Sequence, residues 1–255
     1  MPRFSANLGF LWKDIALPDA IRAAKRAGFE AVECHWPYDF STDSVNQALN
    51  DTGLPMVGIN TRLGINGIDD LGVCAMPGRE AEAKGYIDEA IAYAVAIGCR
   101  NINAVAGKTG STDEAEAVYR RNLAYACAEA AKHDKTIVIE PLSHRAAPGY
   151  HLSNVEKGLE TIKAVGVANL KLMFDVFHVQ VMQGDLIERL RATLPHIGHI
   201  QIAAVPDRGE PDQGEVNYPD LLAALDDMGW DGYVGAEYHP RGTMEQGLGW
   251  LKAYQ

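Results

Sequence analysis

The chain has 255 residues, of which 47% are hydrophobic and 22% charged, and this length suits one large α/β barrel or two smaller domains. The formal net charge of −11, with no cluster of lysines and arginines, argues against binding to nucleic acid or to an anionic membrane. The chain has no apolar run long enough for a membrane span and its start does not resemble a signal peptide, so we expect a cytoplasmic protein.

A short apolar run followed by a segment of helical periodicity recurs from the first residues onward. The first strand is expected at residues 4–9. In the helix that follows, Leu17, Ala20, Ile21 and Ala24 share one face, and Gly28 lies just past its end, where helices prefer glycine. The next expected strands are 31–34 and 56–60, and the next expected helices are 41–50 and 80–97.

The same alternation continues through the second half of the chain. The expected strands are 101–105, 136–140, 170–175, 197–202 and 232–237. Capping boxes are predicted at Ser111-x-x-Glu114 and Ser153-x-x-Glu156, before helices that end near residues 132 and 166. Further helices are expected at 182–194, 219–228 and 244–253.

Eight strand–helix pairs without a linker predict a single (β/α)₈ TIM barrel that spans residues 1–255. Nearly continuous apolar strands indicate a parallel sheet covered by helices. The alternative is an open, doubly wound sheet, but the segment after the first strand lacks the glycine-rich phosphate loop typical of that fold.

Four successive strands of the second half carry a polar residue at or near their end. These residues are Glu140, Asp175, Gln201 and Glu237. A barrel gathers the carboxyl ends of its strands around one mouth, so the four side chains can meet there. Three carboxylates held together repel one another, and a divalent cation removes that repulsion. The oxygen-rich set favours Mg²⁺ or Mn²⁺, with Co²⁺ or Zn²⁺ as alternatives.

Each of the four residues also has an ordinary structural interpretation. Glu140 can be a loop acid, Asp175 a helix cap, Gln201 a hydrogen-bonded core amide, and Glu237 the partner of Arg241. Taken together, four polar residues at equivalent places in neighbouring strands favour the metal site.

Three further residues near these strands are candidates for the same site. His178 lies one helical turn after Asp175, and either contacts a substrate oxygen or forms a local hydrogen bond. Arg208 either binds a substrate carboxylate or pairs with an acid of its own loop. His199 faces the same side of its strand as Gln201, as a supporting residue or as a packed barrel histidine.

The motifs that contain these residues resemble the hydroxypyruvate isomerase family, one of the xylose-isomerase-like barrels together with 2-oxo-tetronate isomerases and ketose 3-epimerases. The motifs are IEPL (139–142), FDVFH (174–178), HIQIA (199–203), PDRGEPDQGEVNYPD (206–220) and GAEYHPRG (235–242). FSANLGFLW at the start and MPGREAEA near Pro77 extend the resemblance over nearly the whole chain. The loop at 62–80 departs from the family pattern, so the resemblance specifies the substrate less well than the chemistry.

The resemblance implies a residue for each role in such an isomerase. One divalent metal ion would be bound by Glu140, Asp175, Gln201 and Glu237, and the two glutamates would also transfer protons. His178 and Arg208 would contact a small hydroxy-carbonyl substrate, with hydroxypyruvate and tartronate semialdehyde as the interconverted pair. In the 3-epimerases the third ligand is usually histidine, so a glutamine at position 201 argues against membership of that group.

Several alternatives remain open. The enzyme can instead be a 2-oxo-tetronate isomerase or a ketose 3-epimerase that acts on a larger sugar. A more distant alternative is a metal-dependent nuclease of the abasic-site type, which would need more histidine ligands and a basic face. The sequence leaves the oligomeric state undetermined, and a homo-oligomer is compatible with it.

Overall fold

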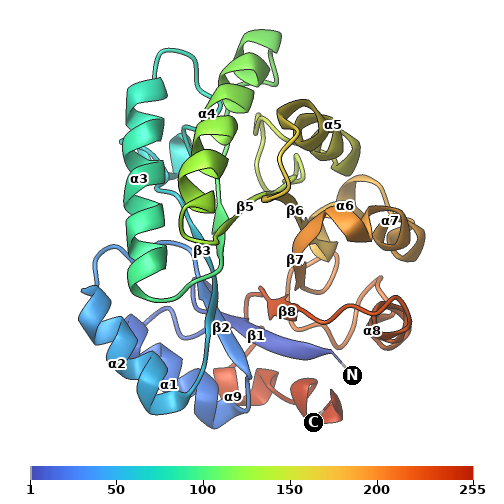
Figure 1. Cartoon of the computed structure of the whole chain (residues 1–255). Coiled ribbons are helices and arrows are strands. Elements are labelled where there is room, and N and C mark those ends of the chain that lie inside the picture. Colours follow the sequence, from blue (N-terminus) through green and yellow to red (C-terminus); the bar gives the residue numbers. More distant parts are fainter. Residues whose placement is uncertain (1, 255) are drawn as a thin grey trace.

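A computed structural model describes residues 2–254, and its eight strands form one closed parallel barrel in chain order (Figure 1). The strands are β1 Arg3–Asn7, β2 Ala31–Cys34, β3 Met56–Asn60, β4 Asn101–Asn103, β5 Thr136–Ile139, β6 Leu170–Asp175, β7 Ile197–Ile202 and β8 Tyr233–Ala236. The barrel closes where β1 pairs with β8, with Ser5 opposite Gly235. The predicted (β/α)₈ barrel is confirmed, and the open-sheet alternative is wrong.

The helices surround the barrel (Figure 1). They are α1 Leu17–Ala27, α2 Thr42–Thr52, α3 Glu80–Ala96, α4 Asp113–Ala131, α5 Val155–Val165, α6 Val176–Met182, α7 Leu186–Thr193, α8 Tyr218–Asp227 and α9 Met244–Gly247, with short 3₁₀ turns at Gly67–Asp69, Leu194–His196 and Leu251–Tyr254. The predicted apolar face of α1 is buried, and the helix ends at Gly28, whose φ of 96° suits glycine. No helix in residues 2–254 has the length and hydropathy to cross a membrane.

Neither predicted capping box forms, and each of the two helices is capped by the following residue. The cap of α4 is Thr112, whose side chain accepts a hydrogen bond from the Ala115 amide, while the Ser111 hydroxyl donates to the carbonyl of His151. The cap of α5 is Asn154 and not Ser153. The helices therefore begin close to the expected places, with different capping residues.

Two helices predicted in the second half are interrupted in the structure. In place of one helix at 182–194, α6 follows β6 directly and α7 begins after Gly184 and Asp185, which both have positive φ angles. The last helix, predicted at 244–253, is divided into α9 and a 3₁₀ turn. The early start of α6 matters for the site, because it places His178 one turn above the end of β6.

Candidate active site

All six predicted site residues lie at the carboxyl-terminal mouth of the barrel. Asp175 is the last residue of β6, and Gln201 lies inside β7. Glu140 and Glu237 directly follow β5 and β8. His178 is in α6 and Arg208 is in the loop after β7. Four of these side chains therefore come from neighbouring strands, as the barrel geometry predicts.

The three carboxylates are buried together and do not ionise alike. Burial, and then the charges of Glu237 and Asp175, raise the pKa of Glu140 well above its usual value. Burial also raises the pKa of Asp175. Burial opposes ionisation of Glu237 as well, but Arg208 and His35 outweigh it and lower the pKa of that carboxyl. The site thus holds more carboxyl groups than its own cations neutralise.

Gln201 is held by a residue that sequence patterns alone did not reveal. Its Nε2 donates a 2.7 Å hydrogen bond to Oε1 of Glu33, a buried carboxylate of β2. Its Oε1 is buried and has no hydrogen-bond partner among residues 2–254. A buried carbonyl oxygen without a partner is unfavourable unless a cation or a donor fills the place in front of it.

The residues present fit a divalent metal ion. A void of about 10 Å³, enough for one water-sized occupant, is bounded by Glu140, Gln201 and Glu237 among others. Donor atoms of Glu140, Asp175 and His178 also lie within 4.8 Å of one another. His178 therefore joins the candidate ligands, although the family resemblance implied a substrate contact for it, and Glu237 is not part of this group.

Arg208 is the cation that faces the carboxylates in the structure. Its Nη2 donates to Oδ2 of Asp175 at 3.0 Å and to Oε2 of Glu237 at 2.8 Å. Its Nη1 lies 2.8 Å from Nε2 of His178, and because a guanidinium only donates, Nε2 accepts there. Burial lowers the pKa of His178 to about 3, so its ring is neutral near pH 7.

Some of the ordinary interpretations hold and others do not, and Gln201 is indeed a buried, hydrogen-bonded amide. Asp175 does cap α6, because its Oδ1 accepts from the Phe177 amide at 2.8 Å, while Oδ2 faces the site. Arg241 pairs with three acids of the loop after β7, namely Asp207, Glu210 and Asp212. Glu237 therefore does not pair with Arg241, and Arg208 pairs with Asp175 and Glu237 instead of an acid of its own loop.

Further polar residues of the first strands support the site. His35 Nε2 lies 2.7 Å from Oε1 of Glu237, and Asn7 Nδ2 donates to the same oxygen at 3.0 Å. His199 Nε2 lies 2.6 Å from Oε2 of Glu33, the carboxylate that also holds Gln201. Glu33 is a charged residue in the otherwise apolar strand AVEC, and that pattern was the available signal for it.

A cavity of about 190 Å³ lies above these groups at the mouth of the barrel. Glu140, His178, Arg208 and Glu237 line it, together with other polar residues such as His35. Apolar and aromatic side chains also line it, including Phe10, Trp36, Leu71, Leu142 and Tyr150. Leu71 belongs to the segment after β3, so the loop that departs from the family pattern forms part of the pocket wall.

Comparisons with known proteins agree with this geometry. A family model described as a xylose isomerase-like TIM barrel matches residues 21–254. The 2-oxo-tetronate isomerase of Cupriavidus necator is 42% identical over 100% of this chain and 99% of its own length. The hydroxypyruvate isomerase of Escherichia coli is 36% identical over all of both chains. A crystal structure named AP endonuclease, family 2, from Brucella melitensis is 38% identical with a TM-score of 0.96, again over both whole chains.

Proposed function

Because the chain belongs to the hydroxypyruvate isomerase family of xylose isomerase-like TIM barrels and is an isomerase, we propose that it interconverts hydroxypyruvate and tartronate semialdehyde with one bound divalent metal ion. The observation that supports this proposal is a small void lined by Glu140, Glu237 and Gln201, whose side-chain oxygen has no partner among the described residues, next to the group formed by Glu140, Asp175 and His178. The preferred ions are Mg²⁺ and Mn²⁺, with Co²⁺ and Zn²⁺ as alternatives.

The reaction moves hydrogen between two adjacent carbons. A proton leaves the CH₂OH carbon of hydroxypyruvate for a carboxylate oxygen, and an enediolate remains. A carboxylic acid then gives a proton to the former carbonyl carbon, and the hydroxyl proton passes to the former carbonyl oxygen. The barrier is the negative charge that builds up on the two substrate oxygens.

The chain's own residues have distinct tasks in this proposal. Glu140 and Glu237 exchange the carbon-bound proton through their carboxyl oxygens, and each positioned acid or base contributes roughly 10²–10⁴-fold. Arg208 binds the substrate carboxylate and His178 a substrate hydroxyl. A metal ion bound by Glu140, Asp175, Gln201 and Glu237, with His178 as a further candidate ligand, would supply positive charge for the developing oxyanions.

The Glu237→Gln substitution tests the proton-transfer role. The variant retains the shape of the side chain, so we expect intact folding by circular dichroism and a loss of kcat of at least about 10²-fold. Glu245→Gln is the matched control, because Glu245 is exposed in α9 and loses the same charge. Wild-type turnover by Glu237→Gln would refute the assignment. Full activity of an enzyme shown by elemental analysis to be metal-free would refute the metal requirement.

A second candidate is a 2-oxo-tetronate isomerase, because the Cupriavidus relative that carries this name is 42% identical. In this proposal the same carboxylates and arginine would serve either substrate, and the two substrates differ in the space that they need beyond the reacting carbons. Comparing kcat/KM for hydroxypyruvate, a 2-oxo-tetronate and a small set of ketoses decides between the two and also tests 3-epimerase activity. A preference of more than about 10-fold for the tetronate would reassign the substrate.

The name of the Brucella protein calls for a separate test of nuclease activity. The chain is strongly acidic, and the candidate metal site in the described residues has one histidine beside its carboxylates. A strongly acidic chain does not suit an enzyme that must hold a polyanion, and one histidine is fewer than expected for the metal site of such a nuclease. We expect no cleavage of a duplex with an abasic site in the presence of Mg²⁺, Mn²⁺ or Zn²⁺, and metal-dependent cleavage would overturn the isomerase proposal.

A further inference from the structure

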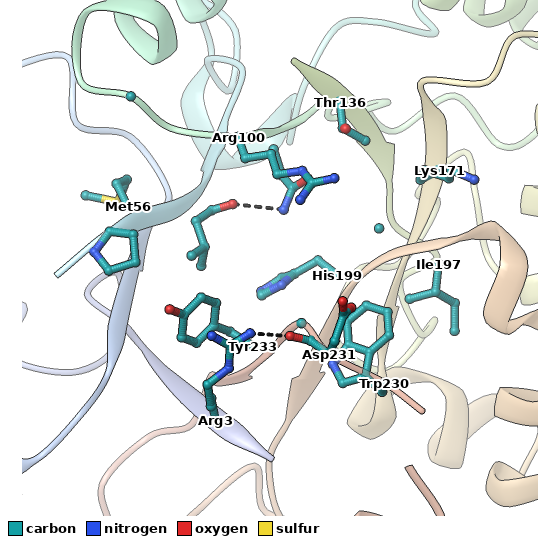
Figure 2. Close-up of a pocket in the computed structure, with 16 residues that line it drawn as sticks. Arg3, Met56, Arg100, Thr136, Lys171, Ile197, His199, Trp230, Asp231 and Tyr233 are labelled. Atoms are coloured by element: carbon teal, nitrogen blue, oxygen red, sulfur yellow. Dashed lines mark hydrogen bonds between the residues drawn. The ribbon is translucent and has the colours of Figure 1, made fainter. Parts of the chain in front are cut away.

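The opposite, amino-terminal mouth of the barrel holds a second and larger cavity, of about 490 Å³ (Figure 2). Its wall is formed by the first residues of several strands, among them Arg3 of β1, Asn101 of β4 and Tyr233 of β8. The candidate active site lies at the other ends of the same strands. Nothing in the proposed isomerisation uses this cavity.

The cavity is basic in a strongly acidic protein. Arg3, Arg100 and Lys171 line it, against the single carboxylate of Asp231, while the whole chain has a net charge of −11. These three cations are far apart in the sequence, which explains why no cluster was visible there. A hollow lined by charges of one sign concentrates ions of the other sign.

Arg3 and Arg100 are exposed arginines in the wall of this cavity. Figure 2 shows Arg3 and Arg100 on opposite sides of the cavity, with the ring of His199 between them. The guanidinium of Arg3 stacks on the Tyr233 ring, 4.5 Å from its centroid, and donates to the Asp231 carbonyl. The guanidinium of Arg100 has no hydrogen-bond or ion-pair partner among residues 2–254. Arg3 is therefore held in position, and Arg100 retains all its donors.

The rest of the wall suits an organic ligand better than a bare ion. Trp230 and Tyr233 contribute aromatic surface, and Met56 and Ile197 contribute aliphatic surface. The ammonium of Lys171 is turned to the carbonyl of Pro195, at 2.9 Å, and adds charge without a direct contact. The cavity thus combines a cationic region with an apolar region, as binding sites for small organic anions do.

We propose that this cavity, between the guanidinium groups of Arg3 and Arg100, binds a small organic anion with a phosphate or carboxylate head and an apolar body. The head lies between the two arginines, and the body contacts Trp230 and Tyr233. The site is separate from the one that binds the substrate.

Calorimetric titration with phenyl phosphate, benzoate and phenol tests the proposal in the whole protein. Saturable binding of phenyl phosphate or benzoate, with none of phenol, is expected, and the tighter of the two anions identifies the preferred head group. The double variant Arg3→Gln/Arg100→Gln should weaken that binding by at least about 10-fold, since two charge-assisted hydrogen bonds are lost. Trp230 fluorescence should change on binding in the wild type.

Two control variants separate this site from general charge and from the active site. Arg121→Gln/Arg191→Gln removes the same charge at exposed positions, and its affinity should stay within about 2-fold of wild type. Arg208→Gln should also leave the affinity unchanged. The proposal is overturned if neither anion binds saturably, if the Arg3/Arg100 variant binds as well as wild type while circular dichroism shows it folded, or if Arg208→Gln alone abolishes binding.

Discussion

Replacing Glu33 with glutamine keeps the size of a side chain at the centre of the barrel and removes its charge. Glu33 accepts hydrogen bonds from Ser5 and Gln201 and pairs with His199. Burial opposes its ionisation, but His199 and the other donors lower its pKa from 4.5 to about 2. The difference of about 2.5 units, at about 1.4 kcal/mol each, corresponds to about 3 kcal/mol of stability near pH 7.

Urea unfolding of metal-free protein at pH 7, followed by circular dichroism, measures this loss. We expect Glu33→Gln to be destabilised by about 3 kcal/mol, because glutamine neither balances the charge of His199 nor accepts at both of its polar atoms. Ser5→Ala is the matched comparison: it removes one hydrogen bond to Glu33 and leaves the charge, so about 1 kcal/mol is expected. A double-mutant cycle with His199→Gln then isolates the coupling within the pair.

A smaller loss of stability for Glu33→Gln than for Ser5→Ala, or a cycle without coupling between Glu33 and His199, would contradict the stabilising role of this buried charge. A second readout connects the interior to the site. With its Nε2 no longer held by a carboxylate, Gln201 loses its fixed orientation, so the variant should also bind Mn²⁺ more weakly than wild type.

Three further predictions concern other parts of the molecule. Burial opposes ionisation of Glu116, but hydrogen bonds, first that of His151, lower its pKa to about 2. The ionised carboxylate therefore stabilises the fold fully above about pH 4.5, and this stabilisation is lost as the pH falls towards 2. In Glu116→Gln the melting temperature should fall less steeply over this pH range. A Cβ at Gly9 would lie 2.2 Å from Nδ1 of His35, so Gly9→Ala should displace that ring from the carboxylate it contacts and lower kcat about 10-fold with little change in melting temperature. Burial raises the pKa of the Cys74 thiol to about 12, so it should resist a thiol reagent at pH 8 until the protein is denatured, and rapid labelling of the folded protein would contradict this.

The fold was predictable because its strands are short, apolar and separated by clear helical segments. The bounds of β2, β3, β6 and β7 agree with the structure residue for residue. Helix starts were less predictable, because adjacent polar residues compete for the capping position: Thr112 caps α4 where Ser111 was expected.

The site was predictable to the extent that its residues come at the ends of strands. Glu140, Asp175 and Glu237 end apolar runs, and the barrel brings such ends together. Glu33 and His35 belong to a short strand and the turn after it, and their partners lie up to 202 residues away in sequence. Only the closed barrel shows these contacts. The metal-ligand set and the substrate contacts of His178 and Arg208 stay predictions.

The carboxylate of Glu33 has a consequence for how this barrel can be divided. The residue belongs to β2, but two of its partners, His199 and Gln201, come from β7, which is reached only near the end of the chain. A fragment that ends after β4 lacks His199 and Gln201. It would either bury the charge of Glu33 without these partners or leave the interior of the barrel open to water. We therefore expect that the amino-terminal half of the chain does not fold as an independent half-barrel, and that the interior completes its polar contacts only when the carboxyl-terminal strands arrive.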